Sequence, residues 1–296
     1  MNKKILGNIL LLITSIIWGS AFVAQITGMA ALGPFTFNAA RSFLAVISLS
    51  ILVFFLKDSM NTKLIDLLKG GLACGLFLFM GSSLQQIGLL YTTAGKASFI
   101  TSLYILMVPI LAFIAMKKRI NFLTCVAIIL GAIGLYLLAI PSGNSFSVNR
   151  GDFIVFIGSF FWGAHILVID YFTKKVNPVK LSLVQFTVMT LVSALVAFTF
   201  ERESISFFNL MISWKPIVYA GIFSSCIAYT LQMVGQKYTE PVLASLILSL
   251  ESVFGALSGY LFLSETLSSK EFIGCIVVFV AIIIAQAPED FLKKNK

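Results

Sequence analysis

The chain has 296 residues, of which 59% are hydrophobic and only 11% are charged. A soluble domain of ordinary composition carries about 25% charged residues, so this chain cannot fold around a single core in water. The formal net charge of +9 would suit a nucleic-acid-binding protein, but the basic residues lie in short clusters between apolar segments and form no continuous stripe. We therefore predict that a lipid bilayer surrounds this protein, and we expect no nucleic-acid partner.

Apolar segments of membrane-spanning length recur along nearly the whole chain. A transmembrane helix needs about 20 predominantly apolar residues, and charged, proline or glycine residues separate such segments here. The pattern predicts an all-α polytopic membrane protein with ten transmembrane helices, over residues 5–27, 34–56, 68–90, 97–116, 121–140, 152–172, 178–200, 215–236, 241–263 and 272–288. Because the connections are short, we expect no separate aqueous domain.

Basic residues are distributed unevenly between the two sides that these spans define. With the N-terminus in the cytoplasm, fifteen Lys and Arg residues fall on the cytoplasmic side and five on the opposite side, while Arg41 lies within a span. Cytoplasmic loops of membrane proteins carry an excess of Lys and Arg. We therefore expect an inner (plasma) membrane protein with both termini in the cytoplasm.

The second half of the chain repeats the first. A shift of 144 positions places Trp18 on Trp162, Pro34 on Pro178 and Arg41 on Gln185. A shift of 147 aligns later segments, namely Leu84-Gln85 with Leu231-Gln232, Tyr91-Thr92 with Tyr238-Thr239 and Ala97-Ser98 with Ala244-Ser245. Since each unit has an odd number of spans, residues 1–143 and 144–296 are predicted to be two inverted five-helix repeats around a central cavity. Inverted repeats indicate alternating access to a site near the middle of the membrane.

These residues resemble the ten-helix EamA-type branch of the drug/metabolite transporter superfamily over nearly the entire chain. The motifs that carry the resemblance are specific in combination: Trp18-Gly19-Ser20-Ala21-Phe22, Pro34 with Arg41-Ser42-Phe43-Leu44, Gly88-Leu89-Leu90-Tyr91-Thr92-Thr93-Ala94, Pro109, Ser249-Leu250-Glu251 and Glu265-Thr266-Leu267-Ser268. The resemblance implies a basket of helices in which the first, third, fourth, sixth, eighth and ninth line a cavity. It also implies transport of amino acids or similar small metabolites. Glu265 matches an acidic position of the family, but Lys118 departs from it at the corresponding place in the first half.

Glu251 is the first candidate for a substrate-binding residue. It lies about ten residues into the predicted ninth span, or about 15 Å deep at 1.5 Å per residue. A charged side chain exposed to lipid at this depth costs at least about 2.5 kcal/mol, so we expect it to face a cavity or a partner. We predict that it holds the charged part of the substrate. A neutral acid that ties two helices together is the alternative.

Trp18 and Trp162 occupy equivalent positions and are predicted to line the cavity. Their indole faces can bind cations or apolar groups, but the glycine after each Trp also fits close helix packing beside a large side chain. His165, the sole histidine, lies three residues after Trp162 and on the same helical face. It either carries protons or makes a structural hydrogen bond.

Four further polar residues complete the predicted cavity. Gln85 and Gln232 form a symmetric pair, Tyr104 aligns with Glu251 at the shift of 147, and Tyr229 lies one turn from Gln232. Such groups can orient a polar ligand.

Arg41 lies about 10 Å inside its span at 1.5 Å per residue. Three interpretations stay open: it holds an anionic group of the substrate, it pairs with a carboxylate, or it snorkels to the interface.

Cysteines and glycines indicate packing. Each of the four cysteines, Cys74, Cys125, Cys226 and Cys275, stands alone in a different apolar segment, so we expect no disulfide, no metal site and no cofactor. Two pairs, Gly71 with Gly75 and Gly255 with Gly259, have the GxxxG spacing that allows close helix approach. This spacing is modest support for a homodimer.

The sequence as a whole predicts a secondary transporter or exporter of small polar metabolites, with amino acids as the first candidates. Organic cations, drugs or nucleosides are the alternative on the same fold. A remote alternative is an intramembrane enzyme that uses a buried Glu and His as acid and base. The chain contains no His-Glu-x-x-His, Gly-x-Ser-x-Gly or glycine-rich phosphate-loop motif, so we predict that it is not an enzyme and is not driven by ATP. Its expected partners are the substrate and the lipid bilayer.

Reporter fusions test the predicted topology. Fusions after Lys63 and Lys174 should report a cytoplasmic location, and fusions after Asn144 and Glu203 an external one, because an odd number of spans separates the two sets. A cytoplasmic signal at Asn144 would contradict the inverted arrangement.

Overall fold

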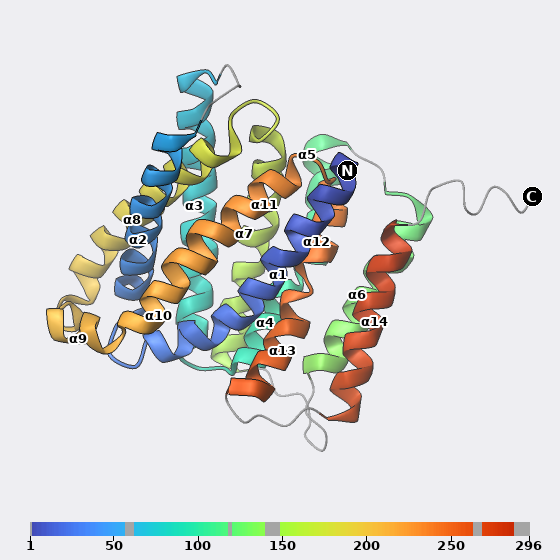
Figure 1. Ribbon diagram of the computed structural model, residues 1–296. Helices are drawn as coiled ribbons and strands as arrows, with labels where there is room; N and C mark the ends of the chain where they lie inside the picture. Colours follow the sequence, from blue (N-terminus) through green and yellow to red (C-terminus); the bar gives the residue numbers. More distant parts are fainter. Residues whose placement is uncertain (1, 57–61, 118–119, 140–148, 263–267, 287–296) are drawn as a thin grey trace, which may run out of the picture.

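The computed structural model in Figure 1 describes residues 2–56, 62–117, 120–139, 149–262 and 268–286, and these ranges contain helices and no strand. The elements are α1 (Lys3–Gly28), α2 (Pro34–Phe55), α3 (Leu64–Gly88), α4 (Ala94–Ser102), α5 (Tyr104–Met116), α6 (Phe122–Ala139), α7 (Arg150–Phe172), α8 (Pro178–Phe200), η1 (Arg202–Ser204), α9 (Phe207–Ile212), α10 (Trp214–Val218), the π-helix η2 (Tyr219–Ala228), α11 (Tyr229–Gln236), α12 (Pro241–Leu248), α13 (Glu251–Phe262) and α14 (Ser269–Gln286). Lys118 and Glu265 lie outside the described residues.

Eight segments of the described chain are long and apolar enough to cross a membrane: Lys3–Gly28, Pro34–Phe55, Leu64–Gly88, Ala94–Ala115, Arg150–Phe172, Pro178–Phe200, Trp214–Gln236 and Pro241–Phe262. The two other predicted spans coincide with α6 and α14, which lie side by side at one edge of the bundle (Figure 1). Eight such helices indicate a multi-pass membrane protein. The count of ten spans stays a prediction.

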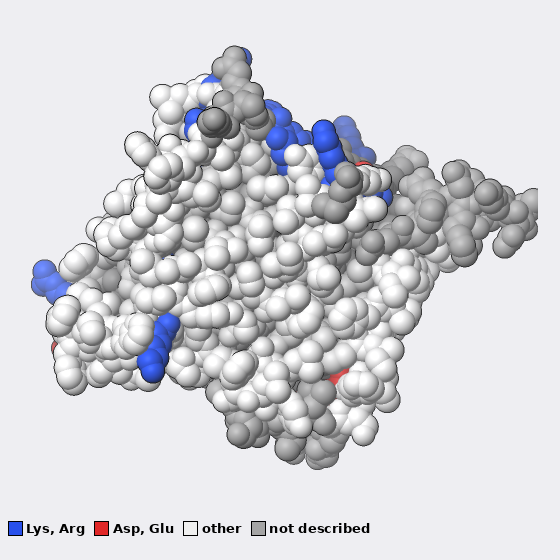
Figure 2. Space-filling model, in the orientation of Figure 1, with Lys and Arg blue, Asp and Glu red and all other residues white. Residues whose placement is uncertain are grey.

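The outer surface of the bundle is apolar. Phe54, Phe200 and Leu195 are 82%, 78% and 69% exposed, and Figure 2 shows a broad band without charged residues across the middle of the molecule. Exposed apolar surface on this scale marks contact with lipid or with other proteins. Lys and Arg gather along the edge at which α1 begins (Figure 2).

The inner faces of the long helices pack against one another. Helix α3 contacts α7 and α8, α2 contacts α8 and η2, and α1 contacts α11, η2 and α13. Three of the four predicted GxxxG residues belong to this packing: Gly71 and Gly75 face Val184 and Val188 of α8, and Gly255 faces Ser98 of α4. The glycine spacing is therefore used within one chain, and a homodimer stays a prediction.

Two of the spans are interrupted near their middle. In one, α4 ends at Ser102 and α5 begins at Tyr104; in the other, α12 ends at Leu248 and α13 begins at Glu251. At both interruptions a backbone hydrogen bond spans three residues instead of the four of an α-helix. Leu103 N donates to Ile100 O and Leu250 N donates to Ile247 O, each at 3.2 Å. A short 3₁₀ turn inside a helix redirects the side chains that follow it.

The two interruptions meet through serine side chains. The Ser102 and Ser252 hydroxyl oxygens lie 2.5 Å apart, and the Ser252 hydroxyl donates to the Ser98 carbonyl at 2.8 Å. Lipid offers no hydrogen bonds to a backbone polar group. The serines therefore satisfy each other and one carbonyl at the point where the helices are irregular.

A charged cluster joins the start of α7 to the start of α4 and to the segment just before it. Asp152 is 2% exposed and accepts hydrogen bonds from Thr92, from the backbone N–H of Asn149 and from Lys96, whose Nζ is 3.2 Å away. At the opposite end of the bundle, the Thr239 hydroxyl donates to the Asn8 side-chain oxygen at 3.0 Å. Both contacts join helices at the two ends of the bundle.

A substitution at Gly19 tests the close approach of α1 to α13. A Cβ atom at this position would lie 2.5 Å from Phe254 Cβ and 2.7 Å from Gly255 N, whereas a Cβ at Gly95 would have no neighbour within 4 Å. Overpacking costs about 1–3 kcal/mol, so Gly19→Ala should lower the unfolding temperature of the purified protein in detergent. Gly95→Ala is the matched control and should be neutral or stabilising by up to about 1 kcal/mol. Equal stability of the two variants would rule out this approach of the helices.

Candidate functional site

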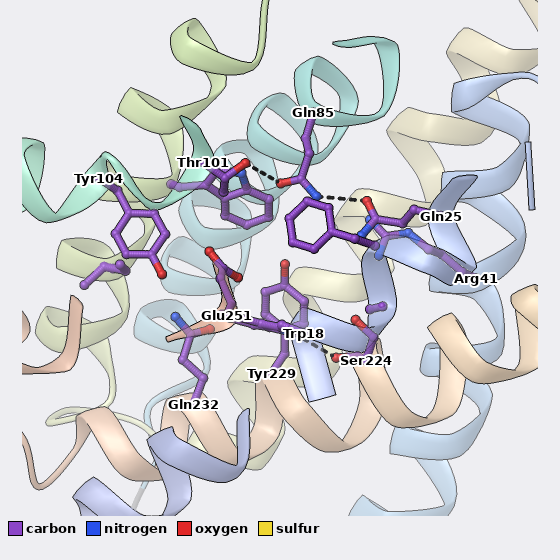
Figure 3. Close-up of a pocket in the computed structure, with 14 residues that line it drawn as sticks. Trp18, Gln25, Arg41, Gln85, Thr101, Tyr104, Ser224, Tyr229, Gln232 and Glu251 are labelled. Carbon is purple, nitrogen blue, oxygen red and sulfur yellow. Dashed lines mark hydrogen bonds between the residues drawn. The ribbon is translucent and has the colours of Figure 1, made fainter. Parts of the chain in front are cut away.

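A cavity in the centre of the bundle collects side chains from nine elements, α1 to α5, α7, η2, α11 and α13 (Figure 3). Seven of the eight residues predicted to line it do so, and Arg41 lies on its wall as well: Trp18, Gln85, Tyr104, Trp162, Tyr229, Gln232, Glu251 and Arg41. Its wall also includes six residues that were not predicted to line it: Ala21, Phe22, Gln25, Thr101, Ile166 and Ser224. The helices that the family resemblance implied all contribute, together with α2.

Little free space remains inside. The room open to the centre of a water-sized molecule is about 30 Å³. A single ordered water needs about 10–15 Å³ on this measure. The free space therefore holds at most a few water molecules, and a metabolite can bind there only if the surrounding side chains or helices move apart.

Aromatic rings form the middle of the cavity wall. The Trp18 and Tyr229 ring centres are 4.6 Å apart, and those of Trp162 and Tyr229 are 6.3 Å apart. The Trp18 indole N–H donates to the Ser224 carbonyl at 3.4 Å, while the Trp162 indole nitrogen has no hydrogen-bond partner among the described residues. Rings on several sides of a small space suit a cationic or apolar group, and the free indole N–H can donate to a ligand.

Glu251 and Tyr104 lie together on one side of these rings (Figure 3). Glu251 is 4% exposed, and its Oε1 accepts a long hydrogen bond of 3.4 Å from Ser102. Neither of the two ion pairs found in the described chain includes Glu251. Both residues follow directly on the helix interruptions, which is why their side chains reach the cavity.

A line of hydrogen bonds crosses the upper wall in Figure 3. The Thr101 hydroxyl donates to Gln85 Oε1 at 3.3 Å, and Gln85 Nε2 donates to Gln25 Oε1 at 2.9 Å. On the lower wall, Gln232 Oε1 is buried without a partner in the described residues. The polar groups of the cavity thus include both oriented donors and a free acceptor.

His165 lies behind the cavity wall. It is fully buried, its Nε2 is 3.0 Å from Gln185 Oε1, and its ring packs edge-on against Trp162 and Tyr229. In this conformation it supports the aromatic rings, and the cavity does not reach it.

Gln25 and Thr101 are cavity residues that the internal repeat does not reveal. Their aligned positions in the second half hold Ile169 and Leu248, so neither forms a symmetric polar pair. Helical spacing would have found Gln25, which lies seven residues after Trp18 and on the same face.

The described residues contain no group of three or more His, Cys, Asp or Glu side chains that could hold a metal ion. The cavity instead offers a carboxyl, a guanidinium, amides and aromatic faces around a confined space. This set suits reversible binding of a small polar molecule.

Comparisons with known proteins extend this picture. The sequence matches the EamA-like transporter family over residues 5–140 and again over 149–286. It is 30% identical over 283 residues to an uncharacterized transporter of Archaeoglobus fulgidus, covering 95% of this chain and 86% of the relative. It is 27% identical over 207 residues to Protein PecM of Dickeya dadantii, covering 68% of each chain. A solved crystal structure superposes with a TM-score of 0.72 over 94% of this chain and 95% of the other, at 18% identity, which shows a shared fold.

Thiol labelling tests whether the cavity opens to water. Gln232→Cys should react with a small charged thiol reagent at least about tenfold faster than Leu195→Cys, because a thiol must ionise to react and lipid suppresses ionisation. Leu195 is 69% exposed on the apolar surface and provides the matched lipid-facing control. The unsubstituted chain gives the background of the native cysteines. Equal rates at the two positions would mean that water does not reach Gln232.

Proposed function

The chain belongs to the EamA-like transporter family, and from this premise we propose that it is a secondary transporter or exporter of small polar metabolites in the inner (plasma) membrane. The observation that carries the proposal is the central cavity, which gathers a carboxyl, a guanidinium and aromatic rings inside an apolar bundle. Ionisable residues in such a place mark substrate or ion pathways by default. Both termini lie in the cytoplasm in this proposal, consistent with the basic residues at the edge where α1 begins (Figure 2).

Transport proceeds by alternating access between two inverted repeats, residues 1–143 and 144–296. Two contacts at opposite ends of the bundle support this arrangement. The shift of 144 aligns Asn8 with Asp152 and the shift of 147 aligns Thr92 with Thr239, and the pairs Asn8–Thr239 and Asp152–Thr92 are both hydrogen-bonded. Opening one end while the other stays closed would expose the cavity to one side at a time.

Glu251 and the aromatic rings hold the cationic part of the substrate. Glu251 forms no ion pair within the described residues, and the aromatic rings of Trp18, Tyr229 and Trp162 line the same cavity. A carboxyl together with aromatic faces recognises ammonium groups. Amino acids are therefore the first candidates. Organic cations are the second candidates, because the same rings would bind them even though they carry no carboxylate group.

Uptake into proteoliposomes, screened across amino acids, organic cations and nucleosides, tests this function. Glu251→Gln keeps the shape of the side chain but removes its charge, and should lower transport by at least about tenfold, equivalent to roughly 1.4 kcal/mol. Glu240→Gln makes the same change at an exposed residue and should leave transport unchanged. Full transport by Glu251→Gln with a lowered unfolding temperature would assign Glu251 a structural role instead.

A further inference from the structure

A buried guanidinium without an acidic partner lies on the cavity wall. The Arg41 side chain is 4% exposed, so it does not snorkel to the surface. Its Nε donates to Asn38 Oδ1 at 2.9 Å, and no carboxylate of the described residues forms an ion pair with it. A buried cation is strongly unfavourable unless an anion or a ligand compensates it. Arg41 therefore lacks the anion that its burial requires.

A second donor reaches the same part of the cavity. The bonds from Thr101 to Gln85 and from Gln85 to Gln25 occupy the Gln25 side-chain oxygen. Its amide nitrogen has no hydrogen-bond partner among the described residues and is left to donate. Gln25, Arg41 and Ser224 all line the cavity, and Figure 3 shows them on the side away from Tyr104. Guanidinium, amide and hydroxyl donors together suit a group that only accepts hydrogen bonds.

The charges do not follow the internal repeat. Arg41 aligns with Gln185, which bonds His165 outside the cavity, and Glu251 aligns with Tyr104. The first half thus supplies one basic residue to the cavity, Arg41, and the second half supplies one acidic residue, Glu251. Figure 3 shows Arg41 and Glu251 on opposite sides of the ring of Tyr229.

We propose that Arg41, with the Gln25 amide and the Ser224 hydroxyl, binds the carboxylate group of the substrate at the opposite end of the cavity from Glu251. This assignment rests on the proposed transport function and narrows it. The substrate carries an anionic group as well as a cationic one, and a carboxylate that reaches Arg41 neutralises the buried guanidinium while it is bound.

A matched series of ligands tests the assignment. The purified protein is screened for thermal stabilisation by the twenty amino acids, and each amino acid that binds is compared with the amine that lacks its carboxylate. In the parent protein at least one amino acid should bind, and its amine should bind at least about tenfold more weakly, because the charge-assisted bonds to Arg41 are lost. Arg41→Gln and Arg41→Met should bind acid and amine about equally.

Control variants and the stability of Arg41→Met separate an effect on binding from an effect on folding. Arg202→Gln makes the same change at an exposed residue and should keep the preference for the acid. Arg41→Met replaces an unpaired buried cation by an apolar side chain, so its unfolding temperature without ligand should be unchanged or higher. Were both neutral variants to unfold, Arg41→Lys would keep the charge but lose the planar fork, and it should weaken the preference for the acid.

Three results would overturn the assignment: an amine that binds the parent as tightly as its amino acid, a folded Arg41 variant with the acid preference intact, or a parent that binds no amino acid. If that parent still transports organic cations in the proteoliposome screen, the transport function stands and only the carboxylate site is wrong. Absence of transport for every class tested would contradict the proposed function itself.

Discussion

The crossing of two interrupted helices is the constraint on which the rest of the structure depends. In hydrocarbon each backbone N–H and C=O must find a partner within the protein, so a helix can be irregular only where another element compensates it. Ser102 and Ser252 meet at this point, and Ser252 also bonds the Ser98 carbonyl. The same crossing fixes Tyr104 and Glu251, the first residues after the interruptions, on the cavity wall. The places at which these two side chains enter the cavity therefore follow from the backbone geometry of the two interrupted helices.

Hydropathy predicted where the helices lie, because lipid imposes the same requirement on every residue of a span. It could not predict the interruptions, since neither proline nor glycine stands at Leu103 or at Ser249 and Leu250. The π-helix Tyr219–Ala228 was equally invisible, because its wider turns have no compositional signature in this sequence. Both features arise from packing between segments that are distant in the chain, and they change which side chains face inward.

The residues of the site also fall into some that the sequence could predict and others that it could not. Symmetric pairs such as Trp18 with Trp162 could be found from the repeat, and they line the cavity. The repeat could not decide the place of His165, because burial beside Gln185 depends on how α7 meets α8. It also gave no reason to choose between the three interpretations of Arg41. Only the three-dimensional arrangement reveals that its guanidinium reaches neither the surface nor an acidic partner among the described residues.

Contacts of different kinds join the helices at the two ends of the bundle. Asn8 and Thr239 share a neutral hydrogen bond, whereas Asp152 attracts the ammonium group of Lys96, whose side chain is 18% exposed. Dissolved ions screen an attraction between exposed charges strongly and one between partly buried charges only weakly, and they leave a hydrogen bond between neutral groups nearly unaffected. The ionic strength of the solution therefore has a modest effect on the contact between Asp152 and Lys96 and almost none on the contact between Asn8 and Thr239.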